Sequence, residues 1–341
     1  MRTRLSILAG LAAMGVLALV AVPTLSTAAD TSAPAGEYDP AQAKGYNAQQ
    51  AKNMEAALPT EAYAKPAKPR KLLVYVESKG YYHASIPIVA AAIKGIGDKT
   101  GAWETSFGND PAVFTPENLA KYDGVFMDNT VTEAPNTDAG KKALLDFVKG
   151  AGGGGKGFMA CHAGADCNHK WDDYADLIGA EFMAHWWGVI KASNRIEDPT
   201  SPLVAMFPKE GFIAWEEIYT FKMPTPKKPQ GYSRDKVHVL LSLDVVASKV
   251  DPAKGDFKDG DYALSWIKKY GDGRVFYTAY GHQVELMWSK PILKHYLAGI
   301  QYALGDLKAD DTPSGKLDWK ALHGPDPATT PLINPVAPAK N

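Results

Sequence analysis

The 341-residue sequence is poor in cysteine and has no excess of either charge. Its two cysteines, Cys161 and Cys167, are too few for a disulfide framework. They could bridge a short loop, or Cys161 could fill core space at the end of a buried strand. With 37 basic and 38 acidic residues, the net charge of −1 predicts no nucleic-acid or polyanionic partner.

Apolar runs of membrane-spanning length are absent beyond the N-terminus. There, Arg2 and Arg4 precede the apolar stretch 5–22, and small residues at 26–29 form a cleavage site. Residues 1–29 are therefore expected to be a signal peptide, a reading favoured over a membrane anchor. This predicts a periplasmic or secreted bacterial protein without membrane contact after cleavage. An Ala-, Pro- and Lys-rich arm over 30–69, weakly helical over 47–58, and a Pro-rich tail over 307–341 flank the domain.

A phosphate-binding loop is also lacking, although residues 150–156 read GAGGGGK. Residue 157 is Gly rather than Ser or Thr, and the run precedes a strand, whereas a P-loop leads into a helix N-terminus. The segment is predicted to be a helix-to-strand turn, which argues against nucleotide binding.

The remaining residues, 70–306, form one predicted domain that begins with alternating strands and helices. Unbroken apolar runs predict buried strands, and apolar residues at helical spacing predict helices. Strands are expected at 71–76, 103–107, 122–127, 158–161, 189–196, 237–243, 262–267 and 274–279, and helices at 85–99, 137–149, 171–179 and 291–304. This order predicts an α/β fold with a doubly wound, mostly parallel sheet and helices on both faces, whose later strands extend the sheet or add a mixed edge. The ligand crevice is expected at the carboxyl ends of the strands.

Four of the eight histidines fall at or near ends of apolar runs: His83, His162, His185 and His282. Imidazole binds metal ions and transfers protons near neutral pH. Because several elements repeat the pattern, these imidazoles are expected to meet in one crevice. A buried carboxylate needs a histidine, a metal ion or hydrogen-bond donors beside it. The acidic candidates are Asp166, Glu216 and Glu217.

Several segments, in this order, resemble one known family: YYHAS, YDGVFMDNT, GGGGKGFMACHAGAD, WDDYADLIGAEFMAHWW, WEEIYTF, YALSWIKKYGDGRVFYTAYGH and LAGIQYALG. Over about residues 71–305 the sequence resembles the trehalose-utilisation (ThuA-like) proteins, whose fold is similar to class I glutamine amidotransferases and to flavodoxin. In amidotransferases the turn after the central strand presents a catalytic cysteine between small residues. The resemblance places His162 in that position and Cys161 toward the core, which implies that the chain is not a glutaminase. Glu216 stands where the family pattern has Asp.

The resemblance implies a hydrolase or lyase of glycoside or keto-sugar metabolism, whose partner is a small-molecule carbohydrate, and the N-terminal segment implies that it is exported. Its site would use imidazoles and carboxylates, with or without a divalent metal ion, of which zinc is favoured. The expected catalytic residues are His162, Asp166, Glu217 and His282. The expected metal ligands are His83, His162 and His185. The aromatic residues expected to contact the sugar are Trp186, Trp187, Tyr219 and Trp288.

Two other functions stay open at this point. In a non-catalytic carbohydrate-binding module, the same histidines and aromatics would bind a sugar without chemistry. In a thiol-dependent hydrolase, Cys161 or Cys167 would be the nucleophile. The sequence also leaves open whether the chain forms a homo-oligomer.

Overall fold

The computed structural model describes residues 38–151, 153–255, 257–315, 318 and 321–334. The predicted signal peptide, residues 1–29, lies outside the described residues, as does the beginning of the predicted arm. Within the described ranges, no helix combines the length and apolar character that crossing a membrane requires.

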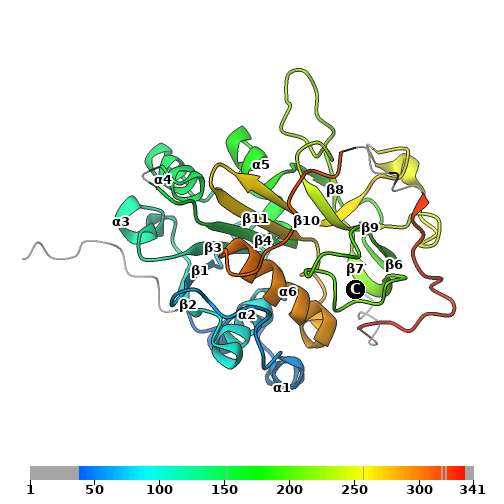
Figure 1. Ribbon diagram of the computed structural model, residues 1–341, viewed down its shortest axis with the longest axis horizontal. Coiled ribbons are helices and arrows are strands. Elements are labelled where there is room, and N and C mark those ends of the chain that lie inside the picture. Colours follow the sequence, from blue (N-terminus) through cyan, green and yellow to red (C-terminus); the bar gives the residue numbers. More distant parts are fainter. Residues whose placement is uncertain (1–37, 152, 256, 316–317, 319–320, 335–341) are drawn as a thin grey trace, which may run out of the picture. The chain divides into compact units, whose positions relative to one another are not determined.

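The main sheet has nine strands in the order β2-β1-β3-β4-β11-β10-β9-β6-β7 (Figure 1). Its strands in chain order are β1 Lys71–Tyr75, β2 Glu104–Gly108, β3 Gly124–Asp128, β4 Gly157–Cys161, β6 Val189–Ile196, β7 Phe212–Glu217, β9 His238–Leu243, β10 Ala263–Tyr270 and β11 Gly273–Thr278. A small second sheet pairs β5 (Phe182–Ala184) with β8 (Thr220–Phe221).

The direction of the strands divides this sheet into two halves. β2, β1, β3, β4 and β11 are parallel neighbours. From β11 onward, β10, β9, β6 and β7 pair antiparallel. The predicted doubly wound α/β class is confirmed, and the expected mixed edge is four strands wide. Because four antiparallel steps separate β11 from β7, both strands end at the same edge of the sheet.

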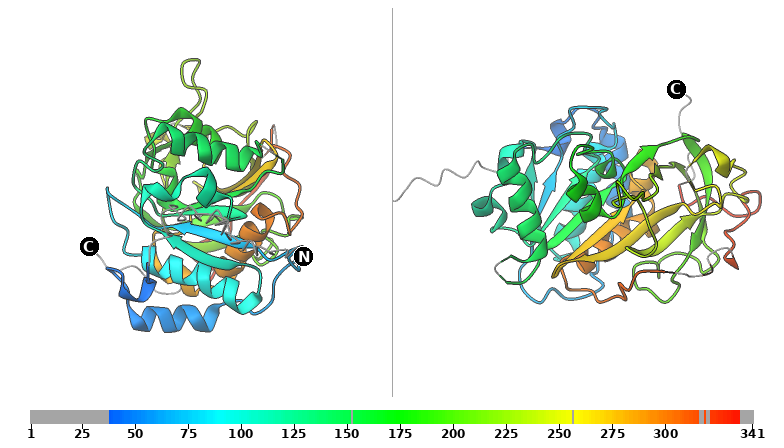
Figure 2. Two further views of the ribbon diagram at one scale, coloured as in Figure 1. Left: turned by 90° about the vertical axis from the view of Figure 1, so that its left-hand side faces the viewer. Right: turned by 90° about the horizontal axis from the view of Figure 1, so that it is seen from above.

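The helices cover both faces of the parallel half. Their bounds are α1 Ala48–Ala57, α2 Ile86–Thr100, α3 Pro116–Leu119, α4 Asp138–Lys149, α5 Asp172–Ile178 and α6 Lys290–Ala303. The short 3-10 turns are η1 Pro40–Gln42, η2 Pro111–Val113, η3 His162–Ala165, η4 Pro252–Lys254 and η5 Val284–Trp288. α2 and α6 pack together on one face, and α4 and α5 cover the other (Figure 2). The four helices expected from the sequence are all present.

The predicted arm lies on the domain through α1. The Asn47 side chain caps this helix by accepting hydrogen bonds from the backbone N–H groups of Gln49 and Gln50. α1 buries Ala51 and Met54 and packs against α2 and η5. The weakly helical patch expected over 47–58 is therefore a helix that covers the outside of α2.

The described part of the C-terminal tail runs along the outer edge of β7. Leu332 forms a bridge with Ile213, and the backbone N–H of Ile333 donates to the carbonyl of Ile213. The Asn334 side chain then accepts from the Trp215 N–H and donates to the Trp215 carbonyl. The tail thus fills backbone hydrogen-bonding positions that an edge strand would otherwise leave open.

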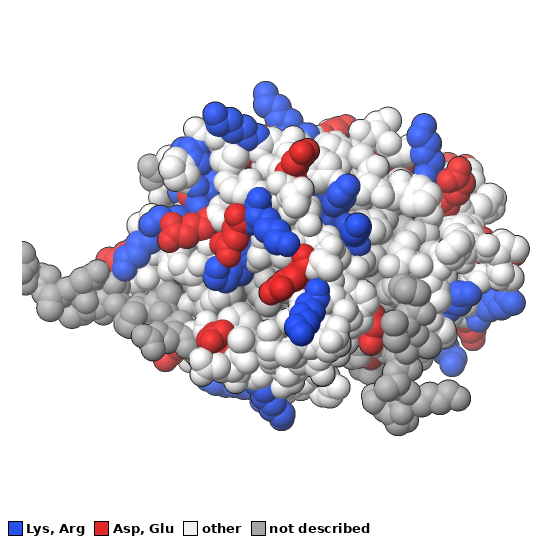
Figure 3. Space-filling view, turned by 90° about the horizontal axis from the view of Figure 1, so that it is seen from below, with Lys and Arg blue, Asp and Glu red and all other residues white. Residues whose placement is uncertain are grey.

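Charged side chains of opposite sign are intermingled on the face of the molecule shown in Figure 3. Lys and Arg alternate there with Asp and Glu. The described residues of this face therefore present no continuous patch of one sign to a charged partner.

Candidate metal centre

Four side chains from four separate segments meet at the carboxyl edge of the sheet. They are His83 in the loop after β1, His162 directly after β4, Glu217 at the end of β7 and His282 in the loop after β11. Each offers one ligand atom, and the four atoms lie within 4.8 Å of one another. We refer to these four residues as the His/Glu cluster. Three of the four histidines expected to converge belong to it.

Three atoms of the His/Glu cluster form a close triangle. Nε2 of His162 lies 3.2 Å from Nδ1 of His282 and 3.4 Å from Oε2 of Glu217, and the last two atoms are 3.2 Å apart. When neither of these two nitrogens carries a proton, all three atoms are hydrogen-bond acceptors. They then need a proton or a cation between them. Ligands bound tetrahedrally to zinc at ~2.0–2.1 Å are about 3.3 Å apart. The triangle therefore has the spacing of three zinc ligands.

His83 completes the His/Glu cluster. Its ring centre lies 5.0 Å from that of His162 and 5.3 Å from that of His282, with the rings nearly perpendicular. The ring is buried, and its Nδ1 has no hydrogen-bond partner among the described residues. An unsatisfied buried polar atom costs roughly 1–3 kcal/mol, a cost that ligation to a metal ion would remove.

A left-handed turn presents His162 at the end of β4. Its φ of 39° is uncommon for a residue other than glycine. The turn is tight: a Cβ added to Gly164 would lie 2.7 Å from the Cβ of Ala160. The hydroxyl of Tyr277 fixes the turn by donating to the carbonyl of His162. A strained turn with small neighbours, as the amidotransferase resemblance implies, therefore directs an imidazole at this position.

Burial and nearby charges set the protonation of the His/Glu cluster. Burial lowers the pKa of His162 to about 4, although the hydrogen bond with Glu217 opposes this effect. Burial, followed by repulsion from His162 and His282, lowers the pKa of His83 to about 3. Burial also disfavours charge on His282, but Glu217 and Glu216 outweigh it and raise this pKa. The pKa of Glu217 is lowered despite its burial, because His162 and His282 hydrogen-bond to it. The lowered pKa values favour neutral His83 and His162 and an ionised Glu217, which are the forms that bind metal ions, whereas His282 would have to release its proton to bind one.

Glu216 lies fully buried behind the His/Glu cluster. Its Oε1 accepts from the backbone N–H of Glu217 at 2.8 Å, and its Oε2 accepts from the N–H groups of Gly281 at 3.3 Å and Gln283 at 3.4 Å. Burial raises the pKa of Glu216 to about 7, while His282 and the three amide donors oppose this rise. The carboxylate therefore contacts the chain on both sides of His282.

His185 and Tyr219 border the His/Glu cluster. The His185 side chain is 54% exposed, and its Nδ1 lies 3.6 Å from Oε1 of Glu217. His185, expected as a metal ligand, therefore lies beside the cluster, whereas His282, expected as catalytic, lies within it. The Tyr219 ring is buried 3.9 Å from the ring of His162, centre to centre. Tyr219, expected to contact a sugar, is therefore a buried neighbour of the His/Glu cluster.

Asp166, expected to act on an imidazole of the site, pairs with another histidine. Its Oδ1 lies 2.8 Å from Nε2 of His169, and this hydrogen bond raises the pKa of His169. Of the expected catalytic residues, His162, Glu217 and His282 share the His/Glu cluster, and Asp166 has its partner outside it.

The three tryptophans expected at the site differ in exposure. Trp186 follows His185 in the chain and is 49% exposed. Trp187 is partly buried and donates its indole N–H to the carbonyl of Asp251 at 3.1 Å. Trp288 ends η5 and packs partly buried against the core. Trp186 is therefore the tryptophan with the most surface available to a ligand.

Both cysteines are buried free thiols. The Sγ of Cys161 lies 3.7 Å from Oδ1 of Asp128, and the Sγ of Cys167 lies 3.3 Å from the carbonyl of Gly164. Burial raises the pKa of Cys161 well above its usual range and that of Cys167 to about 12. Since the thiolate is the nucleophile, these surroundings oppose thiol catalysis.

Asn129 is a site residue whose role the sequence pattern does not reveal. It follows β3 with a φ of 48°. Its Nδ2 donates to Oδ1 of Asp128 and to the carbonyl of Gly281, and its Oδ1 accepts from the N–H of Ala163 at 3.5 Å. Asn129 thereby joins the chain after β3 to the turns that carry His162 and His282. Its position directly after an apolar strand is the one signal in the sequence.

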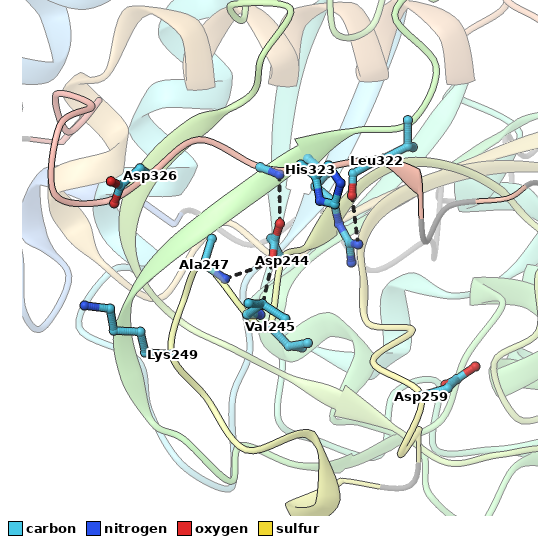
Figure 4. Close-up of a pocket in the computed structure, with 11 residues that line it drawn as sticks. Asp244, Val245, Ala247, Lys249, Asp259, Leu322, His323 and Asp326 are labelled. Carbon is cyan, nitrogen blue, oxygen red and sulfur yellow. Dashed lines mark hydrogen bonds between the residues drawn. The ribbon is translucent and has the colours of Figure 1, made fainter.

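A cavity of about 490 Å³ lies between the turn after β9 and the C-terminal tail (Figure 4). Asp244 lines it and accepts hydrogen bonds from the backbone N–H groups of Val246, Ala247 and Gly324. No member of the His/Glu cluster lines this cavity. Because Asp244 is satisfied by the backbone, it organises the turn and the tail.

Comparisons with solved structures show where this fold recurs. A ThuA-like protein from Bacteroides uniformis ATCC 8492 is 22% identical with a TM-score of 0.56, and the match covers 73% of this chain and 98% of that one. A ThuA-like protein from Parabacteroides merdae ATCC 43184 is 18% identical with a TM-score of 0.51, covering 73% and 96%. These similarities support the amidotransferase-like fold. A comparison with curated proteins found no match.

The sequence also matches a family model over most of the domain. The model is that of ThuA, described as trehalose utilisation, and the match extends over residues 71–303. This range contains all four members of the His/Glu cluster. The chain belongs to the ThuA family.

Proposed function

We propose that this chain is an exported carbohydrate-processing enzyme, a hydrolase or lyase of glycosides or keto-sugars, which binds a divalent metal ion in the His/Glu cluster. The observation that carries the proposal is the meeting of four ligand atoms, from four segments, within 4.8 Å. Membership of a family described as trehalose utilisation supports a carbohydrate as the substrate.

The donor set of the His/Glu cluster suits zinc. Imidazole nitrogens and carboxylate oxygens are typical zinc ligands, and the triangle of His162, Glu217 and His282 has the required spacing. The unpartnered Nδ1 of buried His83 is a further nitrogen that a metal ion would satisfy. When bound, such an ion supplies Lewis acidity or a water of lowered pKa at the sugar bond to be broken.

The chain's own residues would move protons and hold the substrate. Nδ1 of His185 lies 3.6 Å from Oε1 of Glu217, and this exposed imidazole can exchange a proton with a ligand or with solvent beside the His/Glu cluster. Tyr219, packed on His162, keeps that ring in one orientation. The exposed ring of Trp186, next to His185, offers a flat apolar face to a sugar.

The test is a metal analysis of the purified mature protein, followed by a screen of glycosides and their keto derivatives. We expect about one zinc ion per chain and turnover that a chelator abolishes and zinc restores. Sugar binding that chelator leaves unchanged, without turnover, would instead identify a binding module. Full turnover by metal-free protein would refute the metal-assisted mechanism.

Export is a separate part of the proposal. The positive Arg2 and Arg4, the apolar stretch 5–22 and the small residues at 26–29 support it. N-terminal sequencing of protein from the periplasm of an expressing bacterium should begin near residue 30. Recovery of the uncleaved chain in the membrane fraction would identify the segment as an anchor.

A further inference from the structure

From the hydrogen bonds behind the His/Glu cluster, we infer that Glu216 is a positioning residue that sets Glu217 and His282 for metal binding. The inference rests on the proposed function, since it concerns the same cluster. Glu216 offers no ligand atom to the cluster and acts through the backbone of the residues that do.

Both carboxylate oxygens of Glu216 accept hydrogen bonds from this backbone. Oε1 accepts from the N–H of Glu217, and Oε2 accepts from the N–H groups of Gly281 and Gln283. Because the last two residues flank His282, one carboxylate holds the loop on both sides of that imidazole. The same side chain therefore fixes the backbone beside two members of the His/Glu cluster.

No strand pairing could supply this link. β7, which carries Glu216, and β11, which leads to His282, are separated in the sheet by β10, β9 and β6. The Glu216 hydrogen bonds join the end of one strand directly to the loop after the other. The distance between Glu217 and His282 thus depends on a side chain as well as on the sheet.

The loop that Glu216 holds is confined on its other side. Asn129 donates to the carbonyl of Gly281 at 3.2 Å, while the N–H of the same glycine donates to Glu216. A Cβ at Gly281 would lie 3.2 Å from Sγ of Cys161 and 3.3 Å from Cβ of His162. The loop therefore packs closely against the turn that carries His162. Glu216 holds the loop by hydrogen bonds from the β7 side.

A carboxylate is the acceptor that this arrangement requires. Glutamate offers acceptor oxygens on both arms, whereas glutamine has one oxygen and one NH₂ group. In a Glu216→Gln variant, the NH₂ group would face N–H donors on one side, so either the Glu217 contact or the Gly281 and Gln283 contacts would be lost. Loss of an outer partner of a metal ligand costs about 10–100-fold in metal affinity.

The experiment compares Glu216→Gln with the matched variant Glu197→Gln. Glu197 is also buried, and its carboxylate accepts hydrogen bonds from the guanidinium of Arg234, outside the His/Glu cluster. Zn²⁺ affinity is measured by competition with a chromophoric chelator, and the absorption spectrum of bound Co²⁺ reports ligand geometry. We expect Glu216→Gln to weaken Zn²⁺ binding about 10–100-fold and to shift the Co²⁺ bands, with Glu197→Gln within about twofold of wild type. Equal losses in the two variants would overturn the inference.

Hydrogen exchange of the metal-free protein separates the inference from the proposed function. Peptides covering residues 279–289 should exchange faster in Glu216→Gln than in wild type or Glu197→Gln. If the wild-type chain binds no metal, the proposed metal site fails and the metal-binding role fails with it. Faster exchange in Glu216→Gln alone would still support the inference that Glu216 positions the loop after β11. Equal exchange in Glu216→Gln and wild type would overturn that inference. Should Glu216→Gln not fold, Glu216→Asp keeps the charge, shortens the reach and serves the same comparison.

Discussion

Nδ1 of His282 lies 3.2 Å from Oε2 of Glu217, although three strands separate β11 from β7 in the sheet. The carboxylate raises the pKa of the imidazole, and the imidazole helps to lower the pKa of the carboxylate. Each group therefore favours the charged form of the other. With His162 in contact with both, the pair forms the centre on which the proposed chemistry depends.

Replacing His162 by alanine should abolish metal binding and turnover without unfolding the protein. The change removes one corner of the ligand triangle but leaves the strand β4 intact. The control is His323→Ala, which removes an exposed imidazole of the tail. We expect zinc content to fall at least about tenfold in His162→Ala and to stay at the wild-type value in His323→Ala, with similar circular dichroism spectra. Normal turnover by His162→Ala would show that the catalytic assignment is wrong.

His295 should make the protein less stable in mild acid. It lies buried in α6 between the carbonyl of Leu203 and the hydroxyl of Ser265, and burial lowers its pKa from 6.5 to about 4. Between these two values the unfolded chain binds a proton that the folded protein excludes, so stability falls as the pH is lowered through this window. The contribution between about pH 7 and about pH 4.5 is on the order of 2–3 kcal/mol.

Urea titrations with chelator present would measure this contribution. We expect the free energy of unfolding of His295→Gln to change less between the two pH values than that of wild type, even if the variant is less stable at both. A pH dependence equal to that of wild type would contradict the assignment of the effect to His295.

Neither thiol should be needed for activity. Cys161 and Cys167 are buried, and burial raises the pKa of both. Cys161→Ala and Cys167→Ala should keep wild-type turnover at a cost of about 1 kcal/mol in stability. Iodoacetamide should label the native protein far more slowly than the urea-unfolded chain. Inactivation that keeps pace with labelling of the native protein would support a thiol enzyme instead.

Asn334 should contribute to stability through the edge of β7. Its buried side chain makes two hydrogen bonds with the backbone of Trp215. Asn334→Ala should lower the free energy of unfolding by about 1–3 kcal/mol, because the change leaves backbone groups unsatisfied. Thr329→Ala, at an exposed position of the same tail, should stay within about 0.5 kcal/mol of wild type. Equal stability of the two variants in urea denaturation would exclude this role.

The centre of the parallel half follows from the sequence because β1, β3, β4 and β11 are buried on both faces. β1 and β3 lie in unbroken apolar runs, and the strands found there match the expected ones within two residues. β7 does not stand out, because this edge strand mixes buried residues with the half-buried Trp215 and Glu217. β5 and β8 are too short to leave a pattern.

The site could be predicted where it depends on the order of the strands and not where it depends on the path of the loops. His83, His162 and His282 follow parallel strands, so their convergence follows from the topology. His185 lies in a loop after β5, whose course no local pattern fixes. Glu216 and Glu217 are equivalent by sequence, but adjacent residues of a strand point to opposite faces. Which of them meets the histidines is decided by how β7 lies against the loop after β11.

The tail along β7 also bears on self-association. An uncovered edge strand can accept a strand from a second copy, which leads to sheet extension or aggregation. Here Ile333 and Asn334 of the same chain already occupy that position beside Ile213 and Trp215. Two copies could join through this edge only after one of them released its own tail.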